Sequence, residues 1–393
     1  MEDSGVGVTA PPDAVPAEAD GLRFGPAEWS GGLGDLGTFL PVTVSLCLVC
    51  ELNLAVVLIW AGVLNAVTGV LFRQPIPVQP MKAIAALAIA GGLSAGAVRT
   101  AGVGAGLVVA LIGMLGVADR LGRWVPAAIV RGLQLGVGGA LAIRGGSWLI
   151  EEPATLWLAA PVAAAVLLAP RWPRAPLLMG VVFAGLTIGA TSTAPETPAP
   201  PAISFPTSGE WRTGLLELAP AQLPLTLLNS VVAVCVLSAD YFPGRGVRPG
   251  RMATSVGVMN LLTVPLGGMP VCHGAGGLAA QYHFGARTGG AVVLLGGGKI
   301  LAGLALLTAP AGAITAFPRP ILAVLLIAAG WRLASASEAA AGWTAVAVTL
   351  VTGAGVAFAG TLWGVGAGFL LWCVLRLVAR RSPQTLGESG ERS

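Results

Sequence analysis

Charged residues are scarce in this sequence, and their scarcity excludes most soluble proteins. Asp, Glu, Lys and Arg make up 10% of the 393 residues, against about 25% in an ordinary soluble domain. Hydrophobic residues make up 55%, and the mean hydropathy is +0.82. Because apolar runs extend from about Leu33 to Val378, no room is left for a sizeable water-soluble domain. The composition indicates a membrane protein that crosses the bilayer many times.

Cysteine and histidine, the usual ligands of structural metal ions, are also few. The chain has five Cys and two His, and all five Cys lie in apolar stretches. The CxxC pair of Cys47 and Cys50 is expected to pack inside a helix, because a redox pair needs an exposed thiolate. The sequence shows no catalytic dyad and no metal-ligand set, so it predicts neither an enzyme nor a cofactor. The net charge of only +4 argues against a nucleic-acid partner.

The chain consists of a polar tail followed by apolar segments. Residues 1–24 are rich in Ala, Pro, Gly and acidic groups and lack the order of a signal peptide, so we expect a disordered tail. Beyond them, fourteen segments are long enough to cross the membrane, or to cross half of it as broken helices. They lie at about 33–50, 52–71, 78–97, 101–118, 125–143, 154–170, 175–191, 218–240, 252–267, 271–284, 289–309, 318–334, 343–359 and 361–379.

A proline-rich stretch near the middle divides these segments into two sets of seven. Because seven is odd, the second set enters the membrane upside down. Self-similarity supports this arrangement, since residues 62–68 (GVLNAVT) match residues 257–263 (GVMNLLT) at an offset of 195. The predicted fold is an all-α polytopic membrane protein with fourteen transmembrane segments in a 7+7 inverted repeat. The expected divisions are a first repeat at 25–191, an extracellular linker at 192–217, a second repeat at 218–381 and a cytoplasmic tail at 382–393.

Arginine placement predicts the orientation. With the N-terminus inside, fourteen Arg residues fall on the inner side and four on the outer side. By the positive-inside rule, both termini are therefore predicted to be cytoplasmic. The bias of Arg over Lys, 20 to 2, together with abundant Ala and Gly, suggests a bacterial source. The expected location is the bacterial inner (plasma) membrane.

The third and tenth segments both begin with helix-breaking residues. Residues 74–82 (QPIPVQPMK) contain three prolines, which require extended backbone before a helix that begins at about Pro80. Residues 267–277 (GGMPVCHGAGG) combine a proline with several glycines. Broken helices at corresponding places of an inverted repeat are typical of a binding site at the membrane midplane.

A helix that begins inside the membrane presents unpaired N–H donors and a positive dipole end, which favour an anion. Two such ends contribute about +0.5 charge each, and Lys82, one of two lysines in the chain, adds a full unit. The sum of about +2 matches a divalent oxyanion. The alternative is that Lys82 snorkels to the cytoplasmic face and that the glycines serve close helix packing.

Asp35 is an ionisable group in the first apolar segment and is therefore a functional candidate. Its counterpart in the second repeat, at an offset of 194, is Asn229. Because an ionised Asp35 would repel a dianion, we expect its protonation to accompany binding, which makes it the candidate coupling group. The alternatives are that Asp35 accepts bonds from backbone amides of a neighbouring helix start, or that it pairs with Lys82.

Other polar groups complete the predicted site. His273, in the break of the tenth segment, is expected to donate to the anion or to titrate. Arg131 and Gln134 share one helix face in the fifth segment, where a gate role and a structural role are equally open. The residues predicted to bind the substrate are Thr38, Gln79, Met81, Lys82, Asn229, Cys272, His273, Gly274 and Ala275.

Five stretches resemble the molybdate transporter family, which is related to the sulfate permease (SulP) superfamily. They are Glu28–Pro41 (EWSGGLGDLGTFLP), Pro77–Ala86 (PVQPMKAIAA), Val130–Gly136 (VRGLQLG), Gln222–Pro243 (QLPLTLLNSVVAVCVLSADYFP) and Gly268–Gly289 (GMPVCHGAGGLAAQYHFGARTG). The resemblance implies a core domain of segments 1–4 and 8–11, a gate domain of segments 5–7 and 12–14, and uptake of molybdate. Val137 departs from the family, because relatives often carry a polar residue there.

The sequence therefore predicts a secondary transporter that imports molybdate without transforming it, by an elevator movement of the core against the gate. A sulfate permease is the first alternative, and a nucleobase permease of similar fold is the second. Molybdate and sulfate are both tetrahedral dianions, so the resemblance alone ranks them. The expected partners are the oxyanion and the lipid bilayer. The coupling ion stays open between H⁺, Na⁺ and none, with H⁺ through Asp35 as the candidate. The oligomeric state, for which a homodimer is the candidate, also stays open.

Overall fold

The computed structural model describes residues 21–118, 120, 126–151, 157, 160, 163–164, 205–307, 319–335 and 342–381. Most of the predicted sixth segment, the whole seventh segment, half of the linker and the greater part of both tails lie outside these residues. Within them, five helices are long and apolar enough to cross a membrane, or six if one bent pair counts as a span. The predicted helical membrane protein is confirmed at this level.

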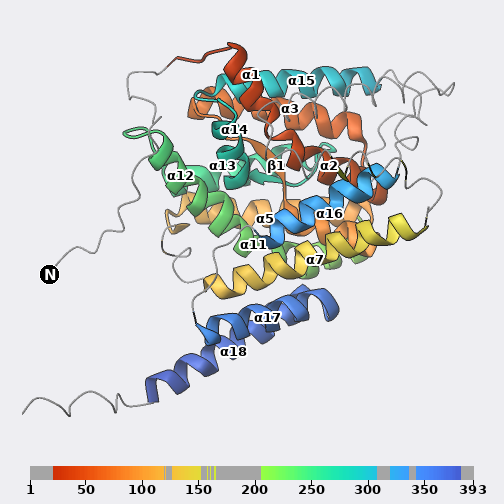
Figure 1. Cartoon of the computed structure of the whole chain (residues 1–393), viewed down its shortest axis with the longest axis vertical. Coiled ribbons are helices and arrows are strands. Elements are labelled where there is room, and N and C mark those ends of the chain that lie inside the picture. The colour runs from red at the N-terminus through yellow and green to blue at the C-terminus, as the bar shows by residue number, and fades with distance from the viewer. Residues whose placement is uncertain are drawn as a thin grey trace, which may run out of the picture.

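The first half of the chain supplies six helices and one strand among the described residues (Figure 1). Their bounds are α1 Pro26–Leu33, α2 Leu36–Cys50, α3 Leu54–Phe72, β1 Val78–Pro80, α4 Lys82–Gly91, α5 Ala95–Met114 and α7 Ala127–Glu151. The first span begins at Pro26, earlier than predicted, because proline is well suited to the first position of a helix. Helices α1 and α2 are bent by 43°. Asp35 lies at this bend and not within a continuous helix.

The second half supplies a similar order of elements. It comprises α10 Ser208–Thr213, η3 Gly214–Leu218, α11 Ala219–Leu225, η4 Thr226–Ala233, α12 Val234–Tyr241, α13 Pro249–Thr263, β2 Val271–His273, α14 Ala275–His283, α15 Gly290–Leu307, α16 Arg319–Ser335, α17 Trp343–Phe358 and α18 Thr361–Arg381. The elements from α10 to α12 form one span of 34 residues. Two parts of it, η3 and η4, have the wider π-helical turn.

The eighth span begins ten residues before its predicted start at residue 218, because a capping box starts the helix at Ser208. The Glu210 amide donates to Thr207 Oγ1 over 3.3 Å, and the Thr207 amide donates to Glu210 Oε2 over 2.7 Å. This T-x-x-E pattern is a recognised start signal. It is readable in the sequence, although the prolines before it favoured a loop over these residues.

The two halves pack against each other through pairs of long helices. Helix α3 lies along α15, α5 along α13, and α7 along α16. Glycines bring the first pair close, since a Cβ at Gly62 would lie 2.5 Å from the carbonyl oxygen of Gly296. Figure 1 shows α3 and α15 on one side of the molecule and α17 and α18 on the other, with α7 and α16 between them. Helices α2 and α4 contact α16 and α7, respectively.

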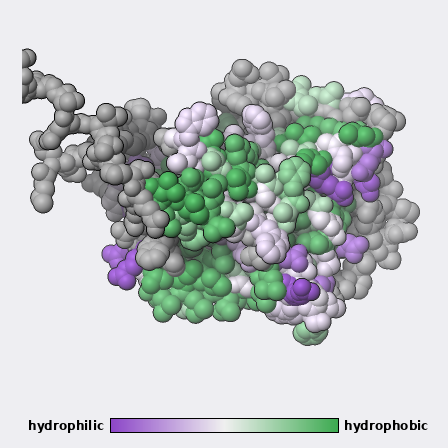
Figure 2. Space-filling view, turned by 90° about the horizontal axis from the view of Figure 1, so that it is seen from below, coloured by the Kyte–Doolittle hydropathy of each residue, from purple (hydrophilic) through white to green (hydrophobic). Residues whose placement is uncertain are grey.

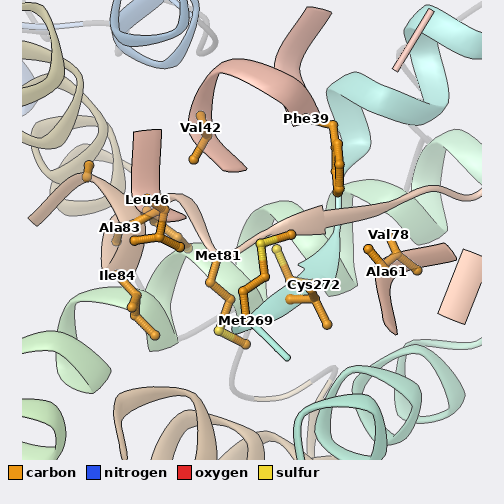
Figure 3. Close-up of a cluster of buried hydrophobic side chains, with 14 of the residues drawn as sticks. Phe39, Val42, Leu46, Ala61, Val78, Met81, Ala83, Ile84, Met269 and Cys272 are labelled. Atoms are coloured by element: carbon orange, nitrogen blue, oxygen red, sulfur yellow. The ribbon is translucent and has the colours of Figure 1, made fainter. Parts of the chain in front are cut away.

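A two-stranded sheet lies at the centre of the helices, and β1 falls where the prolines of residues 74–80 predicted extended backbone. Buried apolar side chains pack around it, and Figure 3 shows Met81, Met269 and Cys272 gathered beside the strands. The core beneath them continues through Leu46 and Ile84. The strands are therefore embedded within the helical assembly and not exposed at its surface.

Large hydrophobic side chains also cover outer surfaces of the molecule. Figure 2, which views the molecule from below, shows broad hydrophobic areas on that face. On α17 and α18 the exposed side chains include Trp343, Leu350, Phe358, Trp363 and Leu370. Exposed apolar surface of this extent is costly in water and favourable in contact with lipid. The surface thus agrees with the hydropathy of the spans.

Candidate functional site

The strands β1 and β2 join the starts of two half-length helices. They pair antiparallel, with Val78 opposite His273 and Gln79 opposite Cys272. The Met81 amide then donates to the Pro270 carbonyl oxygen over 2.9 Å. Helix α4 begins directly after β1 and α14 directly after β2, as the breaker residues predicted. Pro80, however, belongs to β1 and not to the first turn of α4.

Two asparagines hold the outer edges of this strand pair. Asn65 Oδ1 accepts from the Val78 amide, and Asn260 Oδ1 accepts from the Val271 amide, each over 2.8 Å. The Asn260 Nδ2 group also donates to the Val271 carbonyl oxygen over 2.6 Å. The two residues are the matched asparagines of GVLNAVT and GVMNLLT, 195 positions apart. The repeated motif therefore has a structural purpose, which is to satisfy strand-edge groups that have no water to bond.

Replacing either asparagine by Ala should destabilise the protein. Loss of one partner leaves a buried strand amide unsatisfied, which costs about 1–3 kcal/mol. Asn260→Ala should lower the midpoint of thermal unfolding more than Asn65→Ala, because Asn260 also donates to two carbonyl oxygens, those of Val271 and Val256. Thermal unfolding of the detergent-solubilised variants measures this. Equal midpoints for both variants and the parent protein would contradict the assignment.

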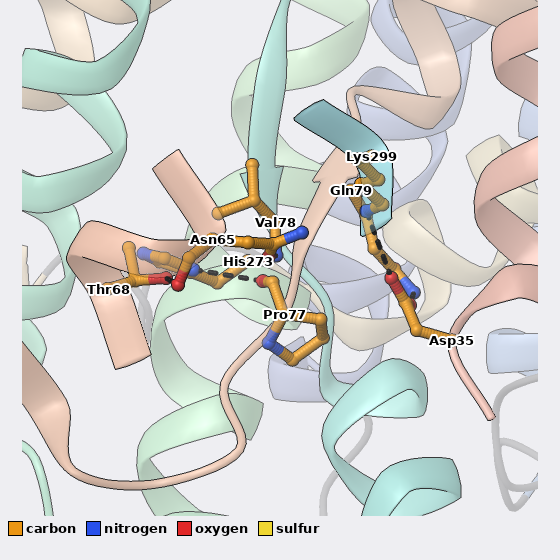
Figure 4. Close-up of polar contacts among 8 residues, drawn as sticks. All are labelled: Asp35, Asn65, Thr68, Pro77, Val78, Gln79, His273 and Lys299. Atoms are coloured by element: carbon orange, nitrogen blue, oxygen red, sulfur yellow. Dashed lines mark hydrogen bonds and ion pairs between the residues drawn. The ribbon is translucent and has the colours of Figure 1, made fainter. Parts of the chain in front are cut away.

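The strand pair has two faces with different chemistry. Directly opposed residues of an antiparallel pair project to the same face, and successive residues project to opposite faces. Gln79 and Cys272 therefore share one face, and Val78 and His273 share the other. Figure 4 shows this division, with Gln79 beside Asp35 and Lys299 on one side and His273 beside Asn65 and Thr68 on the other. The nine predicted substrate-binding residues are thus not all on one face.

On the first face, Gln79 joins Asp35 and Lys299 in a buried polar group. Gln79 Nε2 donates to Asp35 Oδ1 over 2.5 Å, and Lys299 Nζ lies 3.8 Å from Asp35 Oδ2. The Lys299 ammonium also lies 3.3 Å from the centroid of the Phe39 ring, a cation–π contact. All three polar side chains are at most 4% exposed. The cation and the amide donor both favour the ionised form of Asp35, whereas its burial disfavours that form.

The Gln79 side chain lies against the first turn of α14. A Cβ at Gly274 would overlap the Gln79 carbonyl oxygen, and a Cβ at Gly277 would lie 2.5 Å from Gln79 Nε2 and 2.9 Å from Asp35 Oδ1. Glycine at both positions is what allows this approach. The side chains of α1–α2, β1 and α15 thus meet at the start of α14.

Lys299 was not among the residues expected in the site, yet its ammonium lies 3.8 Å from the Asp35 carboxylate. It lies in α15, which covers the predicted apolar segment 289–309. Burying a lysine in an apolar segment costs free energy just as burying Asp35 does. The same reasoning would therefore have identified Lys299 as a functional candidate. Its partner is not readable from the sequence, because 264 residues separate the two.

On the second face, His273 is engaged away from Gln79. Its Nδ1 lies 3.1 Å from the Pro77 carbonyl oxygen, and its Nε2 lies 3.1 Å from Ser255 Oγ. Because a carbonyl only accepts, Nδ1 carries the proton. Complete burial of the ring favours its neutral form, in which Nε2 accepts from the Ser255 hydroxyl. The Phe72 ring packs edge-on against it at 5.6 Å between centroids. Both ring nitrogens thus have partners within the protein, and a role of His273 in donating to the anion or in titrating stays a prediction.

At the start of α4, a second glutamine occupies the helix amides. Gln222 Oε1 accepts from the Ala83 amide over 2.9 Å and from the Ile84 amide over 3.5 Å. Its Nε2 donates to Thr226 Oγ1 over 3.0 Å. Lys82 is the first residue of α4 and is half-buried. Gln222 was not singled out from the sequence, although it opens one of the five stretches quoted above.

The remaining predicted residues lie on elements that flank the strand pair. Met81 and Cys272 are buried, and the Cys272 thiol lies 4.0 Å from the Pro80 carbonyl oxygen. Thr38 and Asn229 are half-buried on α2 and η4, which contact β1 and β2, respectively. Ala275 opens α14. Gly274 precedes it.

The two gate candidates lie on α7, the helix that packs against α4. Gln134 is buried, and its Oε1 has no hydrogen-bond partner within the part of the chain that the structure describes. Arg131 is half-buried on the same helix. Neither belongs to the strand pair. No group of three or more His, Cys, Asp or Glu arranged for a metal ion occurs among the described residues.

The charges near the two helix starts sum to a positive value. The formal charges of Asp35 and Lys299 cancel, and Lys82 at the start of α4 contributes one further positive charge. The first turns of α4 and α14 add their dipole ends, each about +0.5. An anion placed between these turns would meet a net positive field without any bound cation.

Comparison with known proteins gives the family of this chain. The family model described as "Molybdate transporter of MFS superfamily" matches residues 27–141 and 214–333. Molybdate transporter 1 of Arabidopsis thaliana is 34% identical over 93% of this chain and 92% of its own length. This chain belongs to the molybdate transporter family. Molybdate transporter 2 of the same plant is 36% identical over 89% of this chain and 87% of its own, and molybdate transporter 1 of Chlamydomonas reinhardtii is 31% identical over 93% and 95%.

Several solved structures share the fold of this member of the molybdate transporter family. The transmembrane domain of the cyanobacterial bicarbonate transporter BicA superposes with a TM-score of 0.63 at 15% identity, covering 91% of this chain and 99% of that one. SLC26A9 gives a TM-score of 0.65 at 14% identity, covering 91% and 66%. Murine Slc26a9, an anion transporter in the inward-facing state, gives 0.64 at 13%, covering 90% and 68%. These superpositions show that this chain shares the fold of those proteins, and its membership of the molybdate transporter family makes it an anion transporter.

Proposed function

We propose that this protein is a secondary transporter that imports molybdate. The observation that carries the proposal is the meeting of two helix starts, α4 and α14, across a strand pair beside Lys82. Backbone amides of these turns and the Lys82 ammonium would bind the oxyanion, with Gln79, Met81, Cys272, Gly274, Ala275, Thr38 and Asn229 around it. The names of the plant and algal relatives favour molybdate over sulfate.

Two glutamine oxygens bear on how this site would work. Gln222 Oε1 accepts from the first amides of α4, and the Gln79 carbonyl oxygen lies against Gly274 at the start of α14. An incoming oxyanion would replace the neutral Gln222 acceptor at α4 with a charged one. Charge-assisted hydrogen bonds are roughly twice as strong as neutral ones, so the exchange favours the anion.

We propose an elevator movement for the transport step. Its core would comprise α1–α5 and α10–α15, and its gate α7 and α16–α18. Contacts of α2 with α16 and of α4 with α7 form the surface across which the core would slide. The proposal also includes fourteen segments in a 7+7 inverted repeat, cytoplasmic termini, a bacterial inner-membrane location and a homodimer.

Uptake into proteoliposomes tests the substrate. Labelled molybdate should accumulate, unlabelled molybdate should compete best, sulfate more weakly, and uracil not at all. Best competition by sulfate would instead support a sulfate permease. Competition by uracil would overturn the oxyanion assignment, because a nucleobase needs amide or acidic side chains that pair with its edge.

We further propose that transport is coupled to protons through Asp35. Removing the Asp35 carboxylate alone would leave the buried Lys299 ammonium without its ion-pair partner. The informative variant therefore combines Asp35→Asn with Lys299→Met. This pair should still bind molybdate while the dependence of uptake on pH becomes flat, because the group that exchanges the proton is gone. Uptake rates between pH 5 and pH 8 measure this. An unchanged pH profile would remove Asp35 from the coupling step.

A further inference from the structure

A groove lies on the second face of the strand pair, between α3 and α13. Its volume is about 550 Å³. Helices α3 and α13 contact β1 and β2, respectively, so the strand pair lies between these helices. The groove is separate from the first face, where Gln79, Asp35 and Lys299 lie. Nothing in the proposed transport step uses it.

The two walls of the groove are built from matched residues of the repeated motif. Val63, Leu64, Val67 and Thr68 line it from α3, and Val258, Met259, Leu262 and Thr263 line it from α13. Each residue of the first set is 195 positions before its counterpart in the second. Val67 and Leu262 are 46% and 61% exposed, respectively. In a membrane-spanning region, such open apolar walls face lipid, so the occupant they fit is a hydrocarbon chain.

One cation interrupts the apolar lining. Arg251 is the charged residue of the groove and lies in the first turns of α13, near the C-terminal end of α3. Its Nη2 donates to the Leu71 carbonyl oxygen over 3.0 Å, and its guanidinium carbon lies 5.3 Å from the centre of the Phe72 ring. A guanidinium has five N–H donors. The N–H groups that do not bond to Leu71 can bind a phosphate, because the planar guanidinium matches the geometry of phosphate oxygens.

We propose that this groove binds an anionic phospholipid, with an acyl chain between the walls and the phosphate at Arg251. The charge placement agrees, because Arg251 is among the arginines on the predicted cytoplasmic side, where anionic lipids gather. The proposal concerns lipid alone and does not depend on which anion is transported.

Lipid in the groove would contact the support of the strand pair directly. Ser255 lines the groove and donates to His273, whose other nitrogen donates to the carbonyl oxygen of Pro77, next to β1. An acyl chain that fills the groove excludes water from this buried chain of hydrogen bonds. We therefore expect bound lipid to raise the midpoint of thermal unfolding.

Native mass spectrometry tests the site. The protein is delipidated in detergent and is then offered phosphatidylglycerol or phosphatidylcholine. Two matched pairs of variants are compared with the parent protein. The parent protein should retain phosphatidylglycerol preferentially. Arg251→Gln should lose this preference by about tenfold, the value of one charge-assisted bond, whereas Arg23→Gln, an exposed arginine outside the groove, should keep it. Val67→Trp should reduce retention of both lipids by filling the groove, whereas Val70→Trp, on the same helix outside the lining, should not.

Unfolding midpoints with and without lipid provide the second measurement, and they identify variants that fail to fold. Phosphatidylglycerol should raise the midpoint of the parent and of Val70→Trp, but not of Val67→Trp. Equal retention of the two lipids by the parent would overturn the headgroup assignment, and equal behaviour of the Val67 and Val70 variants would overturn the groove itself. A groove covered by a second copy of the chain would appear as a dimer that lipid does not displace, which would also overturn the proposal. Molybdate uptake is not part of any arm, so failure here leaves the transport proposal untouched.

Discussion

Lys299→Met should destabilise the protein more than any other single change considered for the site. The substitution leaves the Asp35 carboxylate, 1% exposed, without the ammonium that lies 3.8 Å away. Removing one partner of a buried ion pair costs about 3–5 kcal/mol, because the charge that remains is uncompensated. The midpoint of thermal unfolding should fall accordingly, and molybdate binding should weaken because Gln79 is held by the same carboxylate. Thermal unfolding and binding of molybdate measure the two effects.

The double variant Asp35→Asn/Lys299→Met is the matched control. It removes both charges, and replacing a whole buried pair by neutral groups is often close to neutral for stability. The double variant should therefore be more stable than Lys299→Met alone, which is a non-additive result that only a direct interaction produces. If the two substitutions instead add, Asp35 and Lys299 do not form a pair of energetic importance.

Lys82→Ala should raise the half-saturation concentration for molybdate tenfold or more. Hydrogen bonds to charged groups contribute about 1.5–3 kcal/mol, and each 1.4 kcal/mol corresponds to about a factor of ten in affinity. Lys82 is the first residue of α4, beside the backbone amides proposed to hold the anion. Lys82→Arg keeps the charge and should retain most of the affinity. Uptake measured over a range of molybdate concentrations separates the variants.

Unchanged half-saturation in Lys82→Ala would mean that the lysine snorkels toward the membrane surface. The positive end of the site would then consist of the two helix starts alone. Because Lys82 is half-buried and not enclosed, Lys82→Ala should change the unfolding midpoint far less than Lys299→Met. A large loss of stability in Lys82→Ala would show that its effect on uptake is structural.

Much of the fold was predictable because the spans and their breaks follow from local properties. Long apolar runs fix where helices lie, and prolines that cannot donate a hydrogen bond fix where extended backbone replaces them. The breaks before α4 and α14 were therefore found to within a few residues. The exception is the eighth span, where the start signal of Thr207 and Glu210 outweighs the prolines that precede it.

The side-chain arrangement of the site was less predictable, because it depends on tertiary register. A shift of one residue in a strand moves each side chain to the other face. His273 and Cys272 are neighbours in the sequence, yet only Cys272 shares a face with Gln79. Similarly, the capping of α4 by Gln222 depends on how the eighth span lies across the third. No pattern within either segment specifies that contact.

The hydrogen bonds between β1 and β2 restrict how the site can release an anion. The Met81 amide bonds to the Pro270 carbonyl oxygen, so the leading ends of α4 and α14 are tied to each other and not only placed near each other. Drawing these two ends apart would break backbone bonds in a region without water to replace them. We therefore expect the anion site, which consists of the strand pair and the first turns of α4 and α14, to keep one shape through the whole transport cycle. The anion would then be exposed first to one side of the membrane and then to the other because the whole site moves with it, and not because the site opens.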